Sequence, residues 1–232
     1  MAKSWNWTTN STLCFVTTGA TAPFTALIES VLSPSSLDAL YAEGYTHLLV
    51  QYGSAKDVFT KASATARTHV QDKMIIDGID FNPDGLQAQL RLVQQSKGLV
   101  ISHAGSGSVL ESLRYQVPLI VVPNTSLLDN HQEELAVAME RSGYLLRGHV
   151  EYAARNCDTS EKIANTGLET LHQLFESLRN SALGCLRFPP SPVVSTGKPR
   201  ASLPSWTRLL ASWIENSSQR PNILKPYCRP PI

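Results

Sequence analysis

The sequence predicts an α/β fold built on a doubly wound parallel sheet, and two observations support this. Short apolar runs rich in β-branched residues alternate with segments of helical periodicity, as in strands joined by crossover helices. Two of the strand-to-helix connections contain glycine turns, TTGAT at 17–21 and HAGSGS at 103–108. Open α/β sheets bind ligands at such turns, because a helix start offers free amides and about half a unit of positive charge.

The predicted elements follow in order along the chain. We expect strands at 13–17, 46–51, 73–81, 99–102, 118–122 and 144–146. Pro23 is expected at the start of the first helix. Apolar residues at helical spacing place the other helices at 33–41, at 86–95, from Ser106 or Ser108 onward, at 130–141 and at 160–179.

Composition and charge fit a soluble enzyme domain. The 232 residues are 42% hydrophobic and 17% charged, which argues against disorder or a fibrous repeat. The net charge of +1 divides into +6 for residues 185–232 and −5 for the remainder, from seven bases and one acid in the tail. No segment approaches the roughly 18 apolar residues of a membrane span, and no signal-peptide core follows Met1. We therefore expect a cytosolic protein with no nucleic-acid partner, whose four cysteines are buried or idle thiols.

The chain divides into a body and a tail of different character. Residues 1–184 form the predicted domain, and nine of the fourteen prolines lie between 189 and 231. We expect 185–202 to be a proline-rich linker, 203–216 an amphipathic helix, and 217–232 a disordered end. One face of that helix is apolar and comprises Trp206, Leu209, Leu210, Trp213 and Ile214.

The candidate site residues each admit a structural and a functional reading. Glycine in HAGSGS could serve only a turn that needs positive φ, yet two turns with Ser and Thr hydroxyls beside free amides favour anion binding. His103 fits a core histidine or a phosphate donor equally well. Glu111 either pairs with Arg114 at i+3 or accepts hydrogen bonds from both hydroxyls of a ribose. Asp129 or Asn130 could cap a helix, but the run Asn130, His131 and Gln132 also suits a sugar.

Several of these motifs resemble one known family. They are VTTGAT-PF, LLVQYG, IIDGIDF, ISHAGSGSVLESLR and PLIVVPN-SLLDNHQEELA. The segments are similar to the catalytic subunit of the two-subunit UDP-GlcNAc transferase of the endoplasmic reticulum, over residues 12–146. More distantly, the chain resembles the donor-binding half of the bacterial transferase that forms lipid II. That enzyme has a GT-B fold, in which two Rossmann-like domains flank a cleft.

The resemblance implies a function and a set of donor contacts. It implies that the chain is the C-terminal, donor-binding half of a GT-B enzyme, which adds GlcNAc with inversion to dolichol-pyrophosphate-GlcNAc on the cytosolic face of the membrane. It implies no cofactor and no metal. A membrane-anchored partner would bind the acceptor, supply the general base, and receive the helix at 203–216. The implied donor-binding residues are Thr18, Gly19, Ala20, Thr21, Phe81, His103, Gly105, Ser106, Gly107, Ser108, Glu111, Asn130, His131 and Gln132.

Two alternatives come from other classes of protein. The chain could hold a UDP-sugar without turnover of its own, which an assay with and without the partner distinguishes. A nicotinamide dehydrogenase would also use glycine turns, but GSGSVL lacks the third glycine of GxGxxG.

Overall fold

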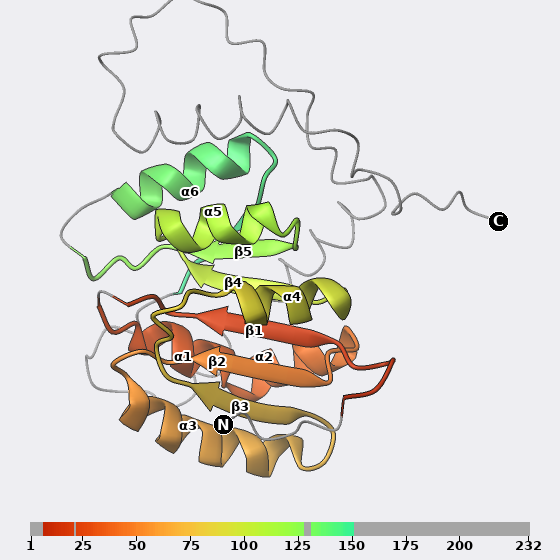
Figure 1. Ribbon diagram of the computed structural model, residues 1–232. Helices are drawn as coiled ribbons and strands as arrows, with labels where there is room; N and C mark the ends of the chain where they lie inside the picture. The colour runs from red at the N-terminus through yellow and green to blue at the C-terminus, as the bar shows by residue number, and fades with distance from the viewer. Residues whose placement is uncertain (1–6, 21, 128–130, 151–232) are drawn as a thin grey trace, which may run out of the picture.

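Six parallel strands form one sheet in the order β3-β2-β1-β4-β5-β6. A computed structural model describes residues 7–20, 22–127 and 131–150 of the chain (Figure 1). The two central strands are buried along almost their whole length, as the apolar sequences LCFVT and LVISH require. The strands run at Leu13–Thr17 (β1), His47–Gln51 (β2), Ile75–Ile79 (β3), Leu99–His103 (β4), Leu119–Val122 (β5) and Leu146–Arg147 (β6).

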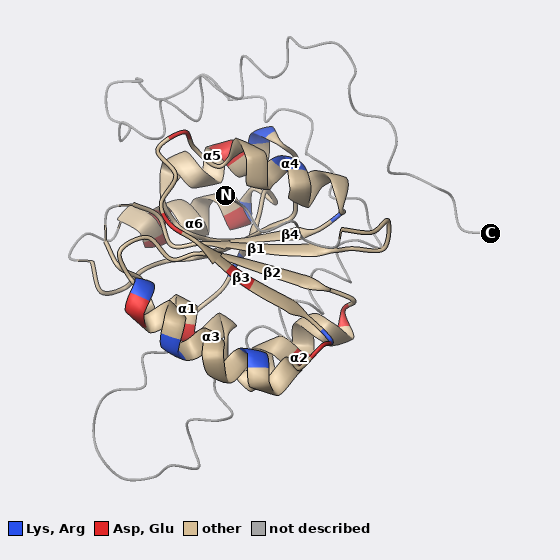
Figure 2. Cartoon of the chain, turned by 60° about the horizontal axis from the view of Figure 1, so that its bottom comes forward, with Lys and Arg blue, Asp and Glu red and all other residues tan. Residues whose placement is uncertain are grey.

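Helices cover both faces of the sheet, which makes the fold doubly wound. One apolar cluster joins the first three helices to one face, and a second joins the last three to the other. Figure 2 shows α1, α2 and α3 on one side of the strands and α4 and α5 on the other. The helices are Thr25–Val31 (α1), Pro34–Ala42 (α2), Lys56–Val70 (α3), Gln87–Gln95 (α4), Ser106–Arg114 (α5) and His131–Arg141 (α6).

The predicted fold class is confirmed, and the element bounds differ at the ends. The strand expected at 73–81 is limited to β3, and the first helix begins at Thr25 rather than at Pro23. The prediction omitted α3, the longest helix described. Its buried residues, Phe59, Ser63, Ala66 and Val70, fall at helical spacing, but only two of the four are large and apolar.

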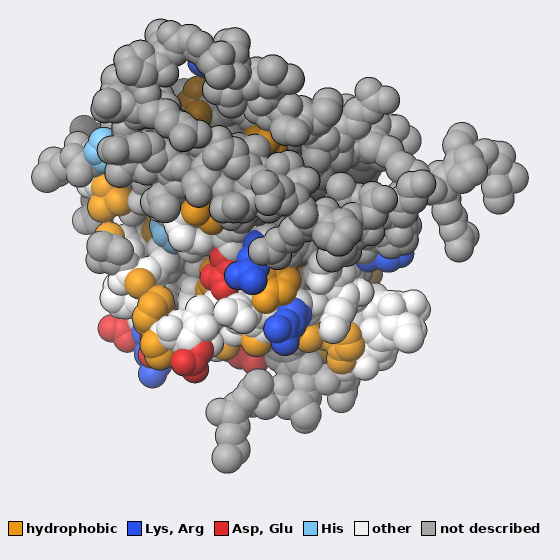
Figure 3. Space-filling model, turned by 45° about the horizontal axis from the view of Figure 1, so that its top comes forward, with side chains coloured by type: hydrophobic (Ala, Val, Ile, Leu, Met, Phe, Trp, Pro, Cys, Tyr) orange, Lys and Arg blue, Asp and Glu red, His pale blue; other side chains and the backbone are white. Residues whose placement is uncertain are grey.

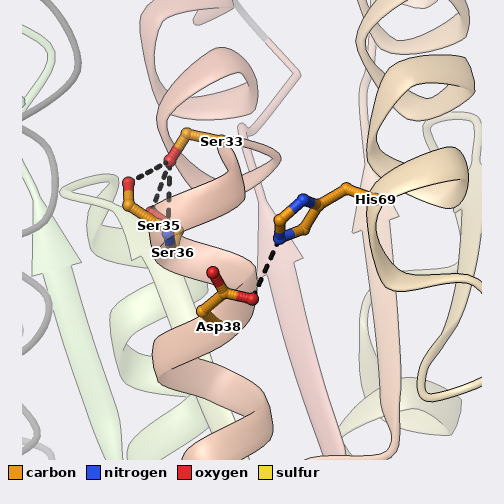
Figure 4. A network of polar contacts seen from close by, with 5 residues as sticks. All are labelled: Ser33, Ser35, Ser36, Asp38 and His69. Carbon is orange, nitrogen blue, oxygen red and sulfur yellow. Dashed lines mark hydrogen bonds and ion pairs between the residues drawn. The ribbon is translucent and has the colours of Figure 1, made fainter.

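The start of α2 is held by a group of serines, as Figure 4 shows. The Ser33 side chain accepts a hydrogen bond from the Ser36 amide at 3.3 Å and donates to the Ser30 carbonyl at 2.8 Å. This confirms the helix expected from the Ser33-Pro34 pair. Further along α2, Asp38 lies 2.9 Å from the His69 ring of α3, a solvent-exposed contact that adds little stability.

At both edges of the sheet, side chains form hydrogen bonds with outward-facing backbone groups. On β3 the Arg67 guanidinium donates to the outward carbonyl of Ile76 at 3.2 and 3.0 Å, and the Asp77 carboxylate accepts from the Gly78 amide at 2.9 Å. On β6 the Arg147 amide donates to the Glu140 carboxylate at 2.9 Å. Such contacts oppose the pairing of a further strand at the edge.

The remaining sequence predictions meet the structure only in part. Cys14 is buried in β1, and burial raises the pKa of its thiol, which fits an idle cysteine. The predicted helix at 160–179, the linker 185–202, the helix 203–216 and the end 217–232 lie outside the described residues. Among the described helices, none has the length and apolar character needed to cross a bilayer.

Candidate functional site

The strand order reverses between β1 and β4, and both glycine turns lie there. The chain leaves β1 toward β2 on one side, and β4 leads to β5 on the other. In doubly wound sheets, ligands bind at the carboxyl ends of the strands beside such a reversal. The two turns that the sequence singled out are therefore neighbours in space, although more than eighty residues separate them in the chain.

The turn after β1 is attached to β2 through its threonines. The Thr17 hydroxyl donates to the Gln51 side-chain oxygen at 2.7 Å, and the Thr18 hydroxyl donates to the Gln51 carbonyl at 3.0 Å. Both threonines are buried. Their hydroxyl hydrogens therefore serve the fold. The Gly19 amide donates a long hydrogen bond of 3.4 Å to the Thr17 hydroxyl oxygen. The Ala20 amide has no acceptor among the described residues, so it and the weakly held Gly19 amide are the parts of this turn that remain for a ligand. Thr21 lies outside the described residues.

The turn after β4 exposes the start of α5. Gly105 is the residue before the helix and has no side chain to cap it, so the amides of Ser106, Gly107 and Ser108 have no acceptor within the helix. Ser106 and Gly107 are exposed, and Ser108 is half-buried. A helix start of this kind can bind a phosphate through its amides and its dipole.

The glycine requirement at this turn differs from the one expected. Gly105 has φ −76°, a conformation open to every residue type, so positive φ is not the reason for glycine there. A Cβ atom at Gly105 would instead lie 2.2 Å from the His103 Nε2 atom. Gly19 combines both constraints, with φ +79° and a Cβ position 2.4 Å from the same nitrogen.

His103 is accordingly a packed side chain between the two turns. Burial lowers its pKa below the ordinary value of 6.5, against a weaker opposing interaction with the Thr17 backbone. The imidazole is therefore neutral at physiological pH. Its buried Nδ1 atom has no hydrogen-bond partner among the described residues.

Glu111 points to the loop between β3 and α4. Its Oε2 atom accepts a long hydrogen bond of 3.4 Å from the Leu86 amide, and its Oε1 atom would lie 3.3 Å from a Cβ at Gly85. No ion pair joins Glu111 to Arg114 among the described residues, whose ion pairs all involve other side chains. The helical pairing considered for Glu111 is therefore wrong. The half-buried carboxylate retains capacity for further hydrogen bonds.

Phe81 and the first residues of α6 complete the carboxyl edge. Phe81 follows β3 and is 48% exposed, an arrangement that leaves its ring available for contact. The Gln132 side-chain oxygen accepts from the Asn124 amide at 2.9 Å, so this glutamine links α6 to the loop after β5. His131 is exposed and lies 3.9 Å from Glu134. Asn130 lies outside the described residues.

Positive side-chain charge is scarce at this edge. In the described loops after β1 to β5 and the first helical turns that follow them, Lys56 is the one lysine or arginine. On the face shown in Figure 3, acidic and basic side chains are interspersed with uncharged ones wherever described atoms are visible. An anionic ligand held by the described residues therefore depends mainly on backbone amides.

Three contributing residues were not expected from the sequence. Gln51 anchors the first turn, Gly53 lies so close to it that a Cβ there would be 2.9 Å from the Gly19 carbonyl oxygen, and the Leu86 amide contacts Glu111. Gln51 ends the strand HLLVQ directly after three apolar residues, and a buried polar residue at a strand end is the signal that could have identified it. Gly53 and Leu86 contribute through their backbone atoms, and the pattern of side chains in the sequence does not predict such contacts.

The fold defines an α/β domain of the doubly wound class, with the two glycine turns paired at the strand reversal. Comparison with known proteins makes this more specific. The family model for the glycosyltransferase family 28 C-terminal domain matches residues 13–180. This chain belongs to that family and is a glycosyltransferase domain.

Individual relatives agree with the family match. The UDP-N-acetylglucosamine transferase subunit ALG13 of Candida glabrata is 33% identical over 198 residues, which span 72% of this chain and 98% of that protein. The subunit of the same name from Yarrowia lipolytica is 42% identical over 135 residues, or 58% of this chain and 63% of that protein. The NMR solution structure of an ALG13 protein superposes with a TM-score of 0.52 at 29% identity, covering 78% of this chain and 90% of that one.

Proposed function

We propose that this chain binds UDP-GlcNAc and transfers GlcNAc to dolichol-pyrophosphate-GlcNAc, the second step in assembly of a lipid-linked oligosaccharide. The observation that carries the proposal is the pair of glycine turns beside the strand reversal, with the uncapped start of α5 between β4 and the open edge. Family membership and the name shared by the relatives support the same reaction.

The donor contacts follow from the chemistry of each group. Amides at Gly19, Ala20 and 105–108 would hold the pyrophosphate, and the Glu111 carboxylate would accept from the ribose hydroxyls. Phe81 would offer an aromatic surface to the uracil base of UDP. Near the sugar, His131 and the amide nitrogen of Gln132 are the described candidates, with Thr21 and Asn130 proposed from the sequence alone.

Catalysis by this chain would be electrostatic. As the bond between the sugar and UDP breaks, negative charge develops on the leaving phosphate, and amides fixed at two turns can stabilise it. The reaction would proceed with inversion, because the acceptor hydroxyl attacks from the side opposite UDP. That hydroxyl needs a general base, which we assign to the partner.

A partner subunit is part of the proposal. The relatives are named as subunits, which supports a complex. We propose that the partner is anchored in the endoplasmic reticulum membrane, binds the dolichol-linked acceptor, and holds this chain at the cytosolic face. We further propose a wider kinship with the bacterial lipid II-forming transferase.

A radiolabelled transfer assay tests the function. The chain and its co-purified membrane partner are assayed together and separately with labelled UDP-GlcNAc and the lipid acceptor. Transfer by the complex, with none by either part, is expected. Donor binding by the chain together with an inactive complex would support the alternative, a UDP-sugar-binding module without turnover.

A further inference from the structure

The His103 imidazole touches both glycine turns with the same atom. Cβ positions built at Gly19 and Gly105 fall 2.4 and 2.2 Å from Nε2, far inside any permissible contact. The ring therefore occupies the space that side chains at both positions would fill. Since β1 and β4 are hydrogen-bonded neighbours, His103 stands at the junction of the two strand ends.

The first turn is restrained on its opposite side as well. Gly53 approaches it so closely that a Cβ there would lie 2.9 Å from the Gly19 carbonyl oxygen. Thr18 fixes the same turn to Gln51 through its amide and its hydroxyl, at 3.3 and 3.0 Å. The turn is thus confined between β2 and the imidazole, and its distance from α5 depends on the ring.

The contacts of the ring are with the backbone of both turns. Nε2 faces backbone on two sides, and the ring also interacts with the backbone of Thr17, the last residue of β1. Gly105 has φ −76°, so its own conformation does not demand glycine. A side chain at that position would instead meet the His103 ring, with its Cβ 2.2 Å from Nε2.

We propose that His103 is a positioning residue that acts as a spacer, setting the distance between the turn after β1 and the start of α5. This inference rests on the proposed function, because the donor pyrophosphate is the group that the two turns would share. A spacer of the wrong size would change donor affinity through the turns, without contact between His103 and the donor.

A double-mutant cycle in the complete complex tests the spacer. The variants are Gly105→Ala, His103→Ala and the double variant, with KM for UDP-GlcNAc and kcat measured for each. Gly105→Ala forces the added methyl against the ring, and we expect KM to rise roughly tenfold or more, about 1.4 kcal/mol per tenfold. The double variant removes the obstruction and is expected to recover a large part of that loss, with kcat changing less than KM.

The opposite pattern overturns the proposal. If His103 contacts the donor directly, the two losses add, and the double variant is poorer than either single variant. Ala64→Gly, an exposed change in α3, controls for the backbone effect of exchanging glycine and alanine. Should His103→Ala not fold, His103→Asn provides a shorter side chain for the same cycle.

A second readout separates this proposal from the proposed function. Calorimetric binding of UDP and thermal unfolding are measured on the same four proteins. A wild-type complex without transfer counts against the function, whereas the steric compensation still appears in unfolding and in UDP binding. Absence of compensation in every readout counts against the spacer.

Discussion

At the residue scale, Glu111 and Gln132 each make one hydrogen bond within the fold and keep a further polar group that could bind a ligand. Glu111 contacts the Leu86 amide through a single long hydrogen bond, so its carboxylate still has accepting capacity. Gln132 uses its oxygen to bind the Asn124 amide, which leaves its amide nitrogen. The sequence identified both residue types but not their contacts, since neither Leu86 nor Asn124 reveals in sequence that its backbone is the partner.

Replacing Glu111 tests the ribose contact. Glu111→Ala should reduce transition-state stabilisation by about 2 to 4 kcal/mol in kcat/KM, because hydrogen bonds to a charged acceptor are the stronger class. The kcat/KM of Glu111→Gln should fall between those of wild type and Glu111→Ala. Arg114→Ala, in the same helix, is the matched control and should stay near wild type. A folded Glu111→Ala complex with normal turnover would remove the residue from the donor site.

One buried histidine, His47, and one half-buried histidine, His103, make stability depend on pH. Burial lowers the pKa of His47 and of His103, so the unfolded chain takes up a proton at higher pH than the folded one. The free energy of unfolding should therefore fall as pH drops below the ordinary histidine pKa of about 6.5. Chemical unfolding at about pH 7.5 and about pH 5.5 measures this loss. His103→Asn should reduce it, whereas an equal loss in that variant and in the exposed-residue control His131→Asn would contradict the assignment.

At the scale of elements, the apolar pattern predicted most of the strands, whereas features that depend on tertiary packing could not be predicted from it. The strands β1, β2, β4 and β5 were predicted closely because each is a continuous apolar run buried on both faces. Helix α3 was missed because only Phe59 and Val70 of its four buried residues are large and apolar, which leaves a sparse apolar pattern in the sequence. The glycine turn before α5 was located, but its cause was not, because the contact between Gly105 and His103 depends on ring orientation, which sequence does not encode.

The β3 edge allows a test at this scale. Arg67→Ala removes two hydrogen bonds to the Ile76 carbonyl, and for so exposed a side chain we expect a loss of about 1 kcal/mol in unfolding free energy. Self-association should rise, because the edge carbonyl becomes free to pair with another strand. Lys61→Ala, an exposed change in the same helix, is the control. Equal stability and equal association in the two variants would show that Arg67 does not protect the edge.

At the scale of the whole molecule, the described domain supplies one side of a reaction. We propose that its carboxyl edge holds a nucleoside diphosphate through amides, since Lys56 is the one lysine or arginine in the described loops and first helical turns there. The acceptor, the general base and the membrane anchor are assigned to a partner. The apolar face of the helix expected at 203–216 is the proposed means of association.

Truncation tests that association. Trp206, Leu209, Leu210 and Trp213 fall at i, i+3, i+4 and i+7, the spacing of one helical face. Their burial could contribute several kcal/mol at about 25 cal/mol per Å², before ordering costs. A chain ending before Leu203 should still bind UDP-GlcNAc weakly but no longer co-purify with the membrane subunit. Full partner binding and activity in that truncation would reject the docking role.

The central claim is that the two glycine turns hold the donor by their backbone amides, and a titration of the isotope-labelled chain with UDP-GlcNAc tests it most directly. With EDTA present, saturable amide shifts are expected at Gly19 and at 105–108, weak for the chain alone and stronger in the complex with its partner. Amides of the β3 edge, such as that of Gly78, should not move. Shifts confined to other regions, or binding that appears only when a divalent ion is added, would contradict the account.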